Sequence, residues 1–186
     1  MNLFTNLLIT KTDNEGVSFS ISITPKSFVK QFLQLLYIIM SQDLRGTDNI
    51  LQTNGSAGTE TSTDSGLLDL TALGASKSKG INVGTGIGAT TLTTFALVAP
   101  ITNGSSAGKL LFQSSNFYLP VVVGNKCSFI VSRDFLNSSP APIVVTEIGM
   151  SSGVDSTHLI ERTVVSPITI LVGETLTVNY EIGITV

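Results

Sequence analysis

The sequence predicts a mainly β protein: an antiparallel β-sandwich, immunoglobulin-like or jelly-roll in type, with an N-terminal β-hairpin and one α-helix. Apolar and polar residues alternate in many short segments, most regularly over residues 176–184, and this period of two is typical of strands with one buried face. Roughly seven to nine such segments follow one another at intervals of about 8–12 residues, as in a sandwich. Only residues 28–40 have the apolar spacing of a helix. A partly open barrel is the nearest alternative.

The N-terminal region, residues 1–43, is expected to hold the hairpin and the helix. Residues 3–10 read as one strand, and residues 17–23 alternate apolar side chains with serine as a second strand. A turn-forming cluster that ends at Gly16 separates the two. The pair therefore predicts a hairpin with one apolar face.

The predicted helix begins at Pro25, with Thr24 as its N-cap, because the missing N–H of a proline costs nothing at the first helical position. From residue 32 to residue 40 the helix is apolar almost all round, so it must be buried on most sides. It therefore packs either between a sheet and another element or on a neighbouring subunit. The residues predicted to form an assembly interface share one stripe: Phe28, Phe32, Leu36 and Ile39.

The remainder of the chain falls into two regions. Residues 44–66 are rich in Gly, Ser, Thr and Asn and predict a connector, either a linker, a long loop or an extended arm. Residues 67–186 predict the sandwich domain, with strands that include 81–83, a threonine-rich segment at 91–98 and a short segment at 117–119.

Charge is scarce in this chain. Asp, Glu, Lys and Arg make up 12% of its 186 residues, about half the usual share, and 23 threonines and 22 serines supply much of its polarity. A formal net charge of −3 with scattered basic residues argues against a nucleic-acid partner, which requires clustered Lys and Arg. Residues 32–42 and 80–108 hold no charged residue, which suits surfaces that neighbours cover.

The sequence predicts no cofactor, no metal site and no membrane span. One Cys and one His exclude a disulfide framework and a His/Cys metal site. The most apolar stretch, residues 28–40, is shorter than the ~20 residues that a membrane-spanning helix needs. The first residues also lack the basic and apolar regions of a secretory signal, so we expect synthesis in a host cytoplasm.

Three features resemble catalytic or binding motifs, and each has a simpler interpretation. Residues 84–88 resemble a phosphate-binding glycine loop, but strand-forming residues follow where a helix should begin, so we predict a glycine turn. His158 lies beside Asp155 and Ser156, which as near neighbours cannot converge into a triad, and it is predicted to be an exposed loop residue. Cys127 alternates with apolar residues and is predicted to be a buried structural thiol. No catalytic residue is therefore predicted.

Arg133, Glu147 and Arg162 are the candidate structural charge pairs. They lie on predicted strands, and in a chain so poor in charge we expect them to be reserved for specific contacts. Either arginine is able to pair with Glu147 between strands. The alternative is that all three lie on solvated strand faces.

Several segments in the second half of the chain resemble β-sandwich virion proteins of tailed bacteriophages, in particular accessory capsid and tail or fibre components. The segments that carry the resemblance are VGTG at 83–86, FIVSRDFLNSS at 129–139, IVVTEIGM at 143–150, RTVVSPI at 162–168 and VGETLTVNYEI at 172–182. The resemblance covers roughly residues 81–186. It implies a non-enzymatic protein that is present in many copies and contacts other virion proteins, and it transfers no functional residue.

We therefore expect a structural subunit of a virus particle, located in the virion, that forms homo-oligomers and assembles with other virion proteins through apolar and uncharged surfaces. The alternative is a receptor- or glycan-binding head of a virion fibre or adhesin, with its site on loops 103–108 and 151–158. The absence of Trp and the presence of only three Tyr weigh against a glycan partner. An enzyme, the third hypothesis, would need a cleft with convergent polar groups.

Overall fold

The computed structural model of the chain describes residues 2–25, 28–42, 47–61, 66–153 and 157–186. The strands are β1 (Asn2–Thr12), β2 (Ser18–Ile23), β3 (Thr47–Leu51), β4 (Ala57–Glu60), β5 (Gly80–Gly84), β6 (Leu111–Phe112), β7 (Asn116–Val123), β8 (Lys126–Leu136), β9 (Ile143–Ser152), β10 (His158–Ile170) and β11 (Thr175–Thr185), and the helix is α1 (Lys30–Ser41). The prediction of a mainly β protein with antiparallel sheets, an N-terminal hairpin and one helix is confirmed.

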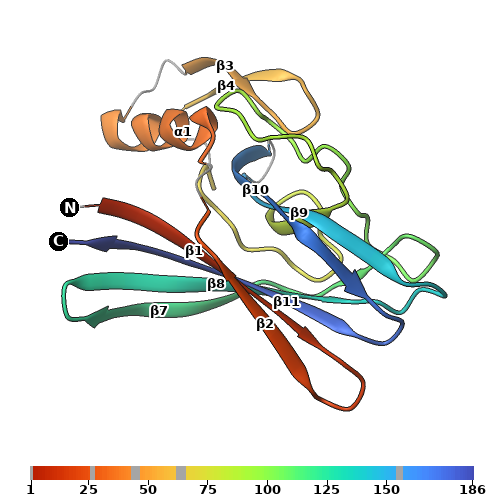
Figure 1. Cartoon of the computed structure of the whole chain (residues 1–186). Coiled ribbons are helices and arrows are strands. Elements are labelled where there is room, and N and C mark those ends of the chain that lie inside the picture. The colour runs from red at the N-terminus through yellow and green to blue at the C-terminus, as the bar shows by residue number, and fades with distance from the viewer. Residues whose placement is uncertain (1, 26–27, 43–46, 62–65, 154–156) are drawn as a thin grey trace.

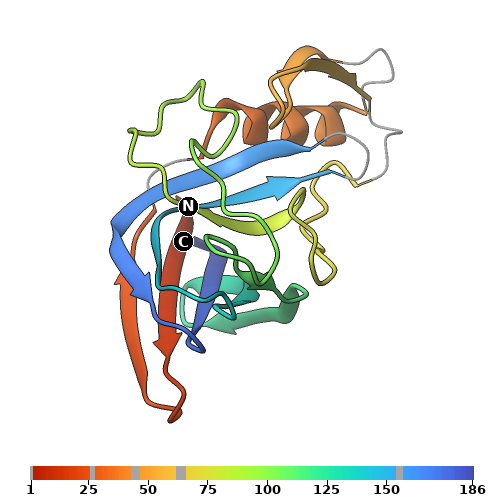
Figure 2. The same cartoon turned by 90° about the vertical axis from the view of Figure 1, so that its right-hand side faces the viewer.

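Two antiparallel sheets form a sandwich-like arrangement. The larger sheet has the order β2-β1-β11-β8-β6, with β7 also paired to β8, and the smaller has the order β10-β9-β5. Figures 1 and 2 show the smaller sheet lying over the larger, and α1 with the two-stranded β3–β4 ribbon on the far side of the smaller sheet. The molecule therefore has three layers.

The core fills the space between the two sheets. Val131, Tyr180 and Leu7 face inward from neighbouring strands of the larger sheet, and Ile81 and Ile148 face them from the smaller; all are fully buried. Alternate side chains along each strand face the core. This alternation fixes the register of the strands, because a slip by one residue would turn the apolar side chains toward solvent.

The N-terminal hairpin is an integral part of the larger sheet. β1 pairs along its whole length with β11, from Asn2 opposite Thr185 to Thr12 opposite Thr175, and on its other side with β2. The hairpin, predicted in an N-terminal region outside the sandwich domain of residues 67–186, thus forms part of the larger sheet of the sandwich.

The helix begins five positions later than predicted. Its N-cap is Val29, in an extended conformation, and neither Thr24 nor Pro25 belongs to it. The reason is tertiary: Phe28 bridges Glu161 of β10, and the Val29 N–H donates to the Ile160 carbonyl at 3.1 Å. This edge pairing holds the residues before α1 extended, so the helix starts only after it.

The predicted connector contains regular structure. β3 and β4 pair in antiparallel fashion, where composition indicated a linker, a loop or an arm. The anchoring residue is Ile50, which is fully buried, and α1 packs against β3 and β10. A single buried apolar side chain hardly changes the composition of a polar segment, so composition did not predict these strands.

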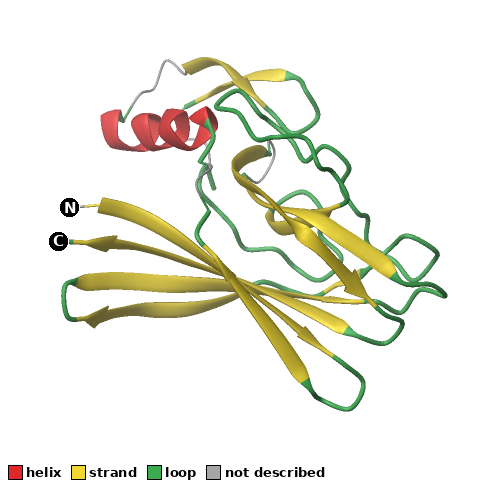
Figure 3. Cartoon of the chain, in the orientation of Figure 1, coloured by secondary structure: helices red, strands yellow, loops and turns green. Residues whose placement is uncertain are grey.

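The threonine-rich segment at 91–98 is a loop and not a strand. Figure 3 shows the long connection between β5 and β6 as loop, lying over the outer side of the smaller sheet. Its backbone bonds in part to side chains and in part to other backbone groups, such as the Ile101 N–H to the Val83 carbonyl of β5. Among the described residues, no helix is long and apolar enough to cross a membrane.

Candidate functional site

A buried ion pair joins the smaller sheet to the loop above it. The Arg162 Nε donates to the Glu147 Oε2 at 2.7 Å, and both side chains are 0% exposed. The Arg162 Nη1 also donates to the Gly88 carbonyl at 2.7 Å. The structure thus pairs Glu147 with Arg162 and not with Arg133, in the interior and not on a solvated face.

Glu147 also binds the backbone of the loop between β5 and β6. Its Oε1 accepts N–H groups from Gly86 at 3.0 Å and Ala99 at 2.7 Å, and its Oε2 accepts the Val98 N–H at 3.0 Å. A Cβ atom at Gly84 or Gly86 would lie 2.4 or 2.6 Å from Oε1. The glycine motif therefore cradles a carboxylate of the same chain, which explains why only glycines fit there.

Arg133 is saturated by carbonyl oxygens. It donates from Nε to the Gln113 carbonyl at 2.8 Å, from Nη1 to that of Ile81 at 2.7 Å and from Nη2 to that of Ser76 at 2.6 Å. Among the described residues it has no carboxylate partner, and burial lowers its pKa to about 10. Arg133 therefore fixes the segment before β5 and is not half of a charge pair.

A second buried carboxyl group connects the two sheets. Glu161 of β10 accepts the Thr163 hydroxyl at 2.5 Å and the hydroxyl of Tyr180, which lies on β11. Burial raises the Glu161 pKa to about 7, although both hydroxyl bonds and the charge of Arg162 act in the opposite direction. Burial together with the nearby Glu161 carboxyl also raises the Tyr180 pKa.

His158 is buried, so the prediction of an exposed loop histidine is wrong. Its Nε2 lies 3.1 Å from the Glu60 Oε1, and its Nδ1 lies 3.3 Å from the Leu51 carbonyl oxygen. Both partners belong to the β3–β4 ribbon, which covers the start of β10. No strands were predicted at residues 47–60, so the burial of His158 beneath the β3–β4 ribbon was not predicted either. Asp155 and Ser156 lie outside the described residues.

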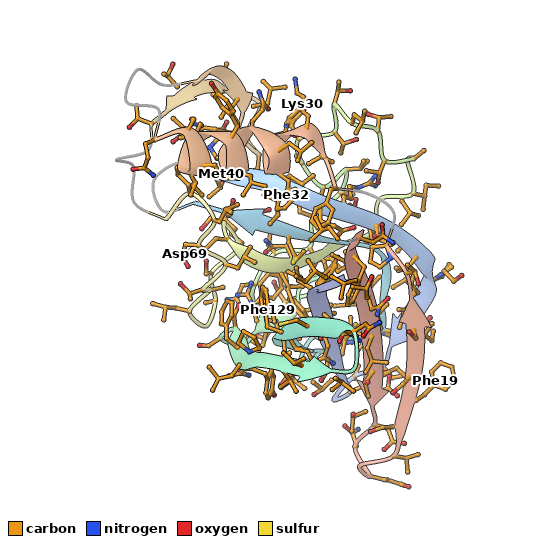
Figure 4. All side chains as sticks on the ribbon, turned by 90° about the vertical axis from the view of Figure 1, so that its left-hand side faces the viewer. Phe19, Lys30, Phe32, Met40, Asp69 and Phe129 are labelled. Carbon is orange, nitrogen blue, oxygen red and sulfur yellow. The ribbon has the colours of Figure 1, made fainter. Side chains whose placement is uncertain are left out.

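The predicted helix interface is only half-exposed. Phe28, Phe32, Leu36 and Ile39 are all of intermediate burial, and Phe32 and Ile39 pack against the core. The rings of Phe28 and Phe32 stack at 4.3 Å, and Figure 4 shows Phe32 beneath the helix, on its side toward the sheets. The exposed apolar side chains of α1 are instead Leu33, Tyr37 and Met40, at 58–76% exposure.

Strand β7 is the most exposed element of the larger sheet. Every residue of Asn116–Val123 is exposed, and six apolar side chains along it are 46–85% exposed: Phe117, Tyr118, Leu119, Val121, Val122 and Val123. The strand lies at an edge, pairing with β8 and, in the part of the chain that the structure describes, with no other strand. Residues 110–125 contain no charged residue.

Shallow apolar hollows flank the β7–β8 hairpin. One, of about 250 Å³, is lined mainly by Leu3, Pro120, Cys127, Phe129, Ile182 and Ile184, so the thiol predicted to be buried is half-buried at a surface hollow. An ion pair beside the hairpin joins Lys126 Nζ to Glu181 Oε1 at 2.5 Å. Burial opposes ionisation of Glu181, but hydrogen bonds from Lys126, Ser128 and Asn6 lower its pKa to about 2. The two charges therefore satisfy each other within the chain.

A pocket of about 390 Å³ lies where the β3–β4 ribbon, β5 and the loop between β5 and β6 meet. Its lining mixes polar residues, such as Thr53, Asn82 and Ser151, with apolar ones, such as Leu97 and Ile101. Among the described residues that line the pocket, Lys77 is the one charged side chain. The pocket thus combines hydroxyl, amide and apolar groups with the positive charge of Lys77.

The sequence prediction missed β7 as a surface. A short strand was predicted at 117–119, and the signal that would have marked its edge position is the uncharged run 110–125, which is longer than the neutral stretch at 32–42. No family model, no curated protein and no solved structure matches this chain. Among the described residues no group of three or more His, Cys, Asp or Glu is placed to hold a metal ion.

Proposed function

We propose that the chain is a non-enzymatic structural subunit of a virus particle, a bacteriophage capsid-accessory or tail component, that assembles through apolar and uncharged surfaces. The observation that carries this proposal is strand β7. It is exposed along its whole length, it carries six exposed apolar side chains, and it has no charged residue.

An exposed, uncharged edge strand favours aggregation in a protein that remains monomeric. Natural sheets protect exposed edges with lysines, prolines, bulges or a covering element, because unpaired backbone groups pair with other chains. Contiguous exposed apolar patches likewise mark interaction sites. β7 has a proline and a bulge but no charge, so its exposure supports a subunit that neighbours cover in its working state.

The outer side of α1 supports the same interpretation. Leu33, Tyr37 and Met40 lie three and four residues apart and are all exposed, so they form one apolar stripe. Residues 32–42 hold no charge. We therefore assign the assembly contact predicted for the helix to this outer stripe and not to the half-buried side chains of Phe32 and Ile39.

The choice of a virion over another assembly rests on the resemblance of residues 81–186 to virion β-sandwich proteins. A direct test is peptide mass spectrometry of virus particles purified on a density gradient from a culture that makes the protein. The proposal expects peptides of this chain in the particle fraction at many copies per particle, and at a ratio to the major capsid peptides that stays constant across the band. Peptides confined to the soluble fraction would contradict it.

A receptor- or glycan-binding head is the second candidate, and the pocket that Lys77 and several hydroxyl groups line favours it. Ser151 and Thr157 line the pocket and belong to one of the two loops expected to carry such a site. The matching test is a glycan array probed with the chain and with a Lys77→Ala variant. Binding that Lys77→Ala abolishes would support the head; an array without hits, together with peptides in the particle band, would favour the structural subunit.

A further inference from the structure

We propose that two copies of this chain associate through β7, which pairs in antiparallel fashion with β7 of the second copy about a two-fold axis. This inference rests on the proposed function, because it names the surface and the partner of an assembling subunit. The two larger sheets would then join into one continuous sheet across the axis.

The position of β7 makes this pairing available. β8 occupies one side of the strand, from Asn116 opposite Ser132 to Val123 opposite Lys126. In the described part of the chain no strand occupies the other side. A strand in that state presents a row of backbone donors and acceptors, which is the template for pairing with another chain.

Exposed apolar side chains lie at the proposed contact. Pairing centred on Val122 places Val121, Val122 and Val123 of the two copies side by side, and these valines are 58–71% exposed. The hollow lined by Pro120, Cys127 and Phe129 adjoins them. A standard specific interface buries about 800 Å² per partner, and these apolar groups supply a part of it.

Charge selects a second copy as the partner. No residue from 110 to 125 is charged, and the nearby Lys126 and Glu181 already neutralise each other at 2.5 Å. A neutral surface has no complementarity to offer to an acidic or basic partner. It is complementary to itself, and an isologous contact of this kind closes as a dimer.

The sequence of β7 sets the centre of the pairing. Pairing with β8 is irregular between Tyr118 and Val121, and Pro120 has no N–H to donate. Of the two regular parts, Asn116–Tyr118 and Val121–Val123, the second consists of three β-branched residues with high strand propensity. The opposite edge of the sheet, β2, alternates with serine at positions 18, 20 and 22 and offers less apolar area, so the geometry points to Val122 as the residue nearest the two-fold axis.

Sedimentation equilibrium of the full chain and of matched variants tests the pairing. The wild-type chain is expected to be in a concentration-dependent equilibrium between monomer and dimer. Val122→Lys would place two like charges together at the axis and is expected to raise the dissociation constant at least about 100-fold. Val98→Lys, at a similarly exposed valine on the loop over the smaller sheet, is expected to leave it unchanged. Leu119→Lys, at the most exposed side chain of β7, repeats the test where folding is least affected.

Cross-linking tests the symmetry. In a Cys127→Ser background, Val122→Cys is expected to form a disulfide-linked dimer on mild oxidation, and Val98→Cys is not. A wild-type oligomer that survives Val122→Lys and Leu119→Lys would overturn the β7 contact and leave the proposed function standing, as would a wild-type chain that is monomeric at all concentrations but present in particles. Absence of the chain from purified particles would instead overturn the proposed function, whatever the outcome for β7.

Discussion

The interior beside the smaller sheet and the β7 edge of the larger sheet use polarity in opposite ways. Beneath the loop between β5 and β6, Glu147 and Arg162 are fully buried and bonded to each other and to backbone groups. Along β7 every residue is exposed and none is charged. A protein with 12% charged residues thus buries some of them completely while leaving an edge strand neutral.

The difference indicates what the charges do in this protein. Two of the buried ionic groups hold segments that lack regular structure: Glu147 binds the backbone at Gly86 and Ala99, and Arg133 binds the Ser76 carbonyl before β5. These long loops have few strand partners for their backbone groups, and a buried polar backbone group without a partner is costly. These two groups therefore stabilise loops, whereas the β7 edge carries no charge at all.

The largest expected effect comes from Glu147. Glu147→Ala leaves a buried arginine without its carboxylate and three N–H groups without their acceptor, so it should lower the free energy of unfolding by about 3–5 kcal/mol. Urea denaturation followed by circular dichroism measures it. Glu15→Ala, at an exposed turn residue, is the matched control and should change stability by less than about 0.5 kcal/mol. A loss below about 1 kcal/mol in Glu147→Ala would contradict the role of the buried pair.

Arg133 should come next. Arg133→Met removes the donors that several buried carbonyl groups share, and we expect a loss of about 2–4 kcal/mol with faster proteolysis near residues 73–79. Arg133→Lys keeps the charge but not the planar fork of donors, so it should recover only a part of this loss. Full recovery by lysine would show that charge, and not carbonyl capping, is what the position requires.

Substitution of Glu161 should stabilise the protein, in contrast to the two substitutions above, and the gain should depend on pH. Its pKa rises from 4.5 to about 7 on folding, so between these values the folded state binds the proton more tightly and stability falls as the pH rises. Glu161→Gln removes this term and should stabilise the protein at pH 8 by about 1–3 kcal/mol, with a much smaller gain at pH 4.5. Thermal unfolding of both proteins across this pH range measures the difference. An equal gain at both pH values would exclude titration of Glu161 as the cause.

Gln31 should give the smallest effect. It is fully buried on α1, and neither of its amide atoms has a hydrogen-bond partner among the described residues. Gln31→Leu keeps the shape roughly constant and removes the unpaired groups, so it should raise the free energy of unfolding by about 1 kcal/mol. Gln113→Leu, at an exposed glutamine, should give no gain. A loss of stability in Gln31→Leu would mean that the amide has a partner, such as a bound water.

Much of the fold was predictable because it depends on local alternation. The period of two in residues 176–184 and in residues 17–23 predicts β11 and β2, and both are strands of the larger sheet. The start of α1 was not predictable, because Pro25 is a good first helical residue locally and the bridge between Phe28 and Glu161 is a contact over more than a hundred residues.

The candidate sites were predictable only in part, for a related reason. A charge that is rare in the sequence indicates a specific contact, and this predicted a partner for Glu147 but left either arginine open; the structure shows Arg162. It does not separate a carboxylate partner from a set of carbonyl oxygens, so Arg133 was misassigned. Likewise the apolar stripe of the helix was found, but which of its sides faces solvent depends on the β3–β4 ribbon and β10 that cover the other.

Amide hydrogen exchange of the wild-type chain at low and at high protein concentration tests the central claim most directly. Peptides from β9, which lies inside the smaller sheet, give an internal reference. If β7 is the neutral edge that a second copy covers, exchange in residues 121–123 should slow at least about 10-fold at high concentration while β9 stays unchanged. Equal exchange of β7 at both concentrations, in a sample that sedimentation shows to be oligomeric, would contradict it.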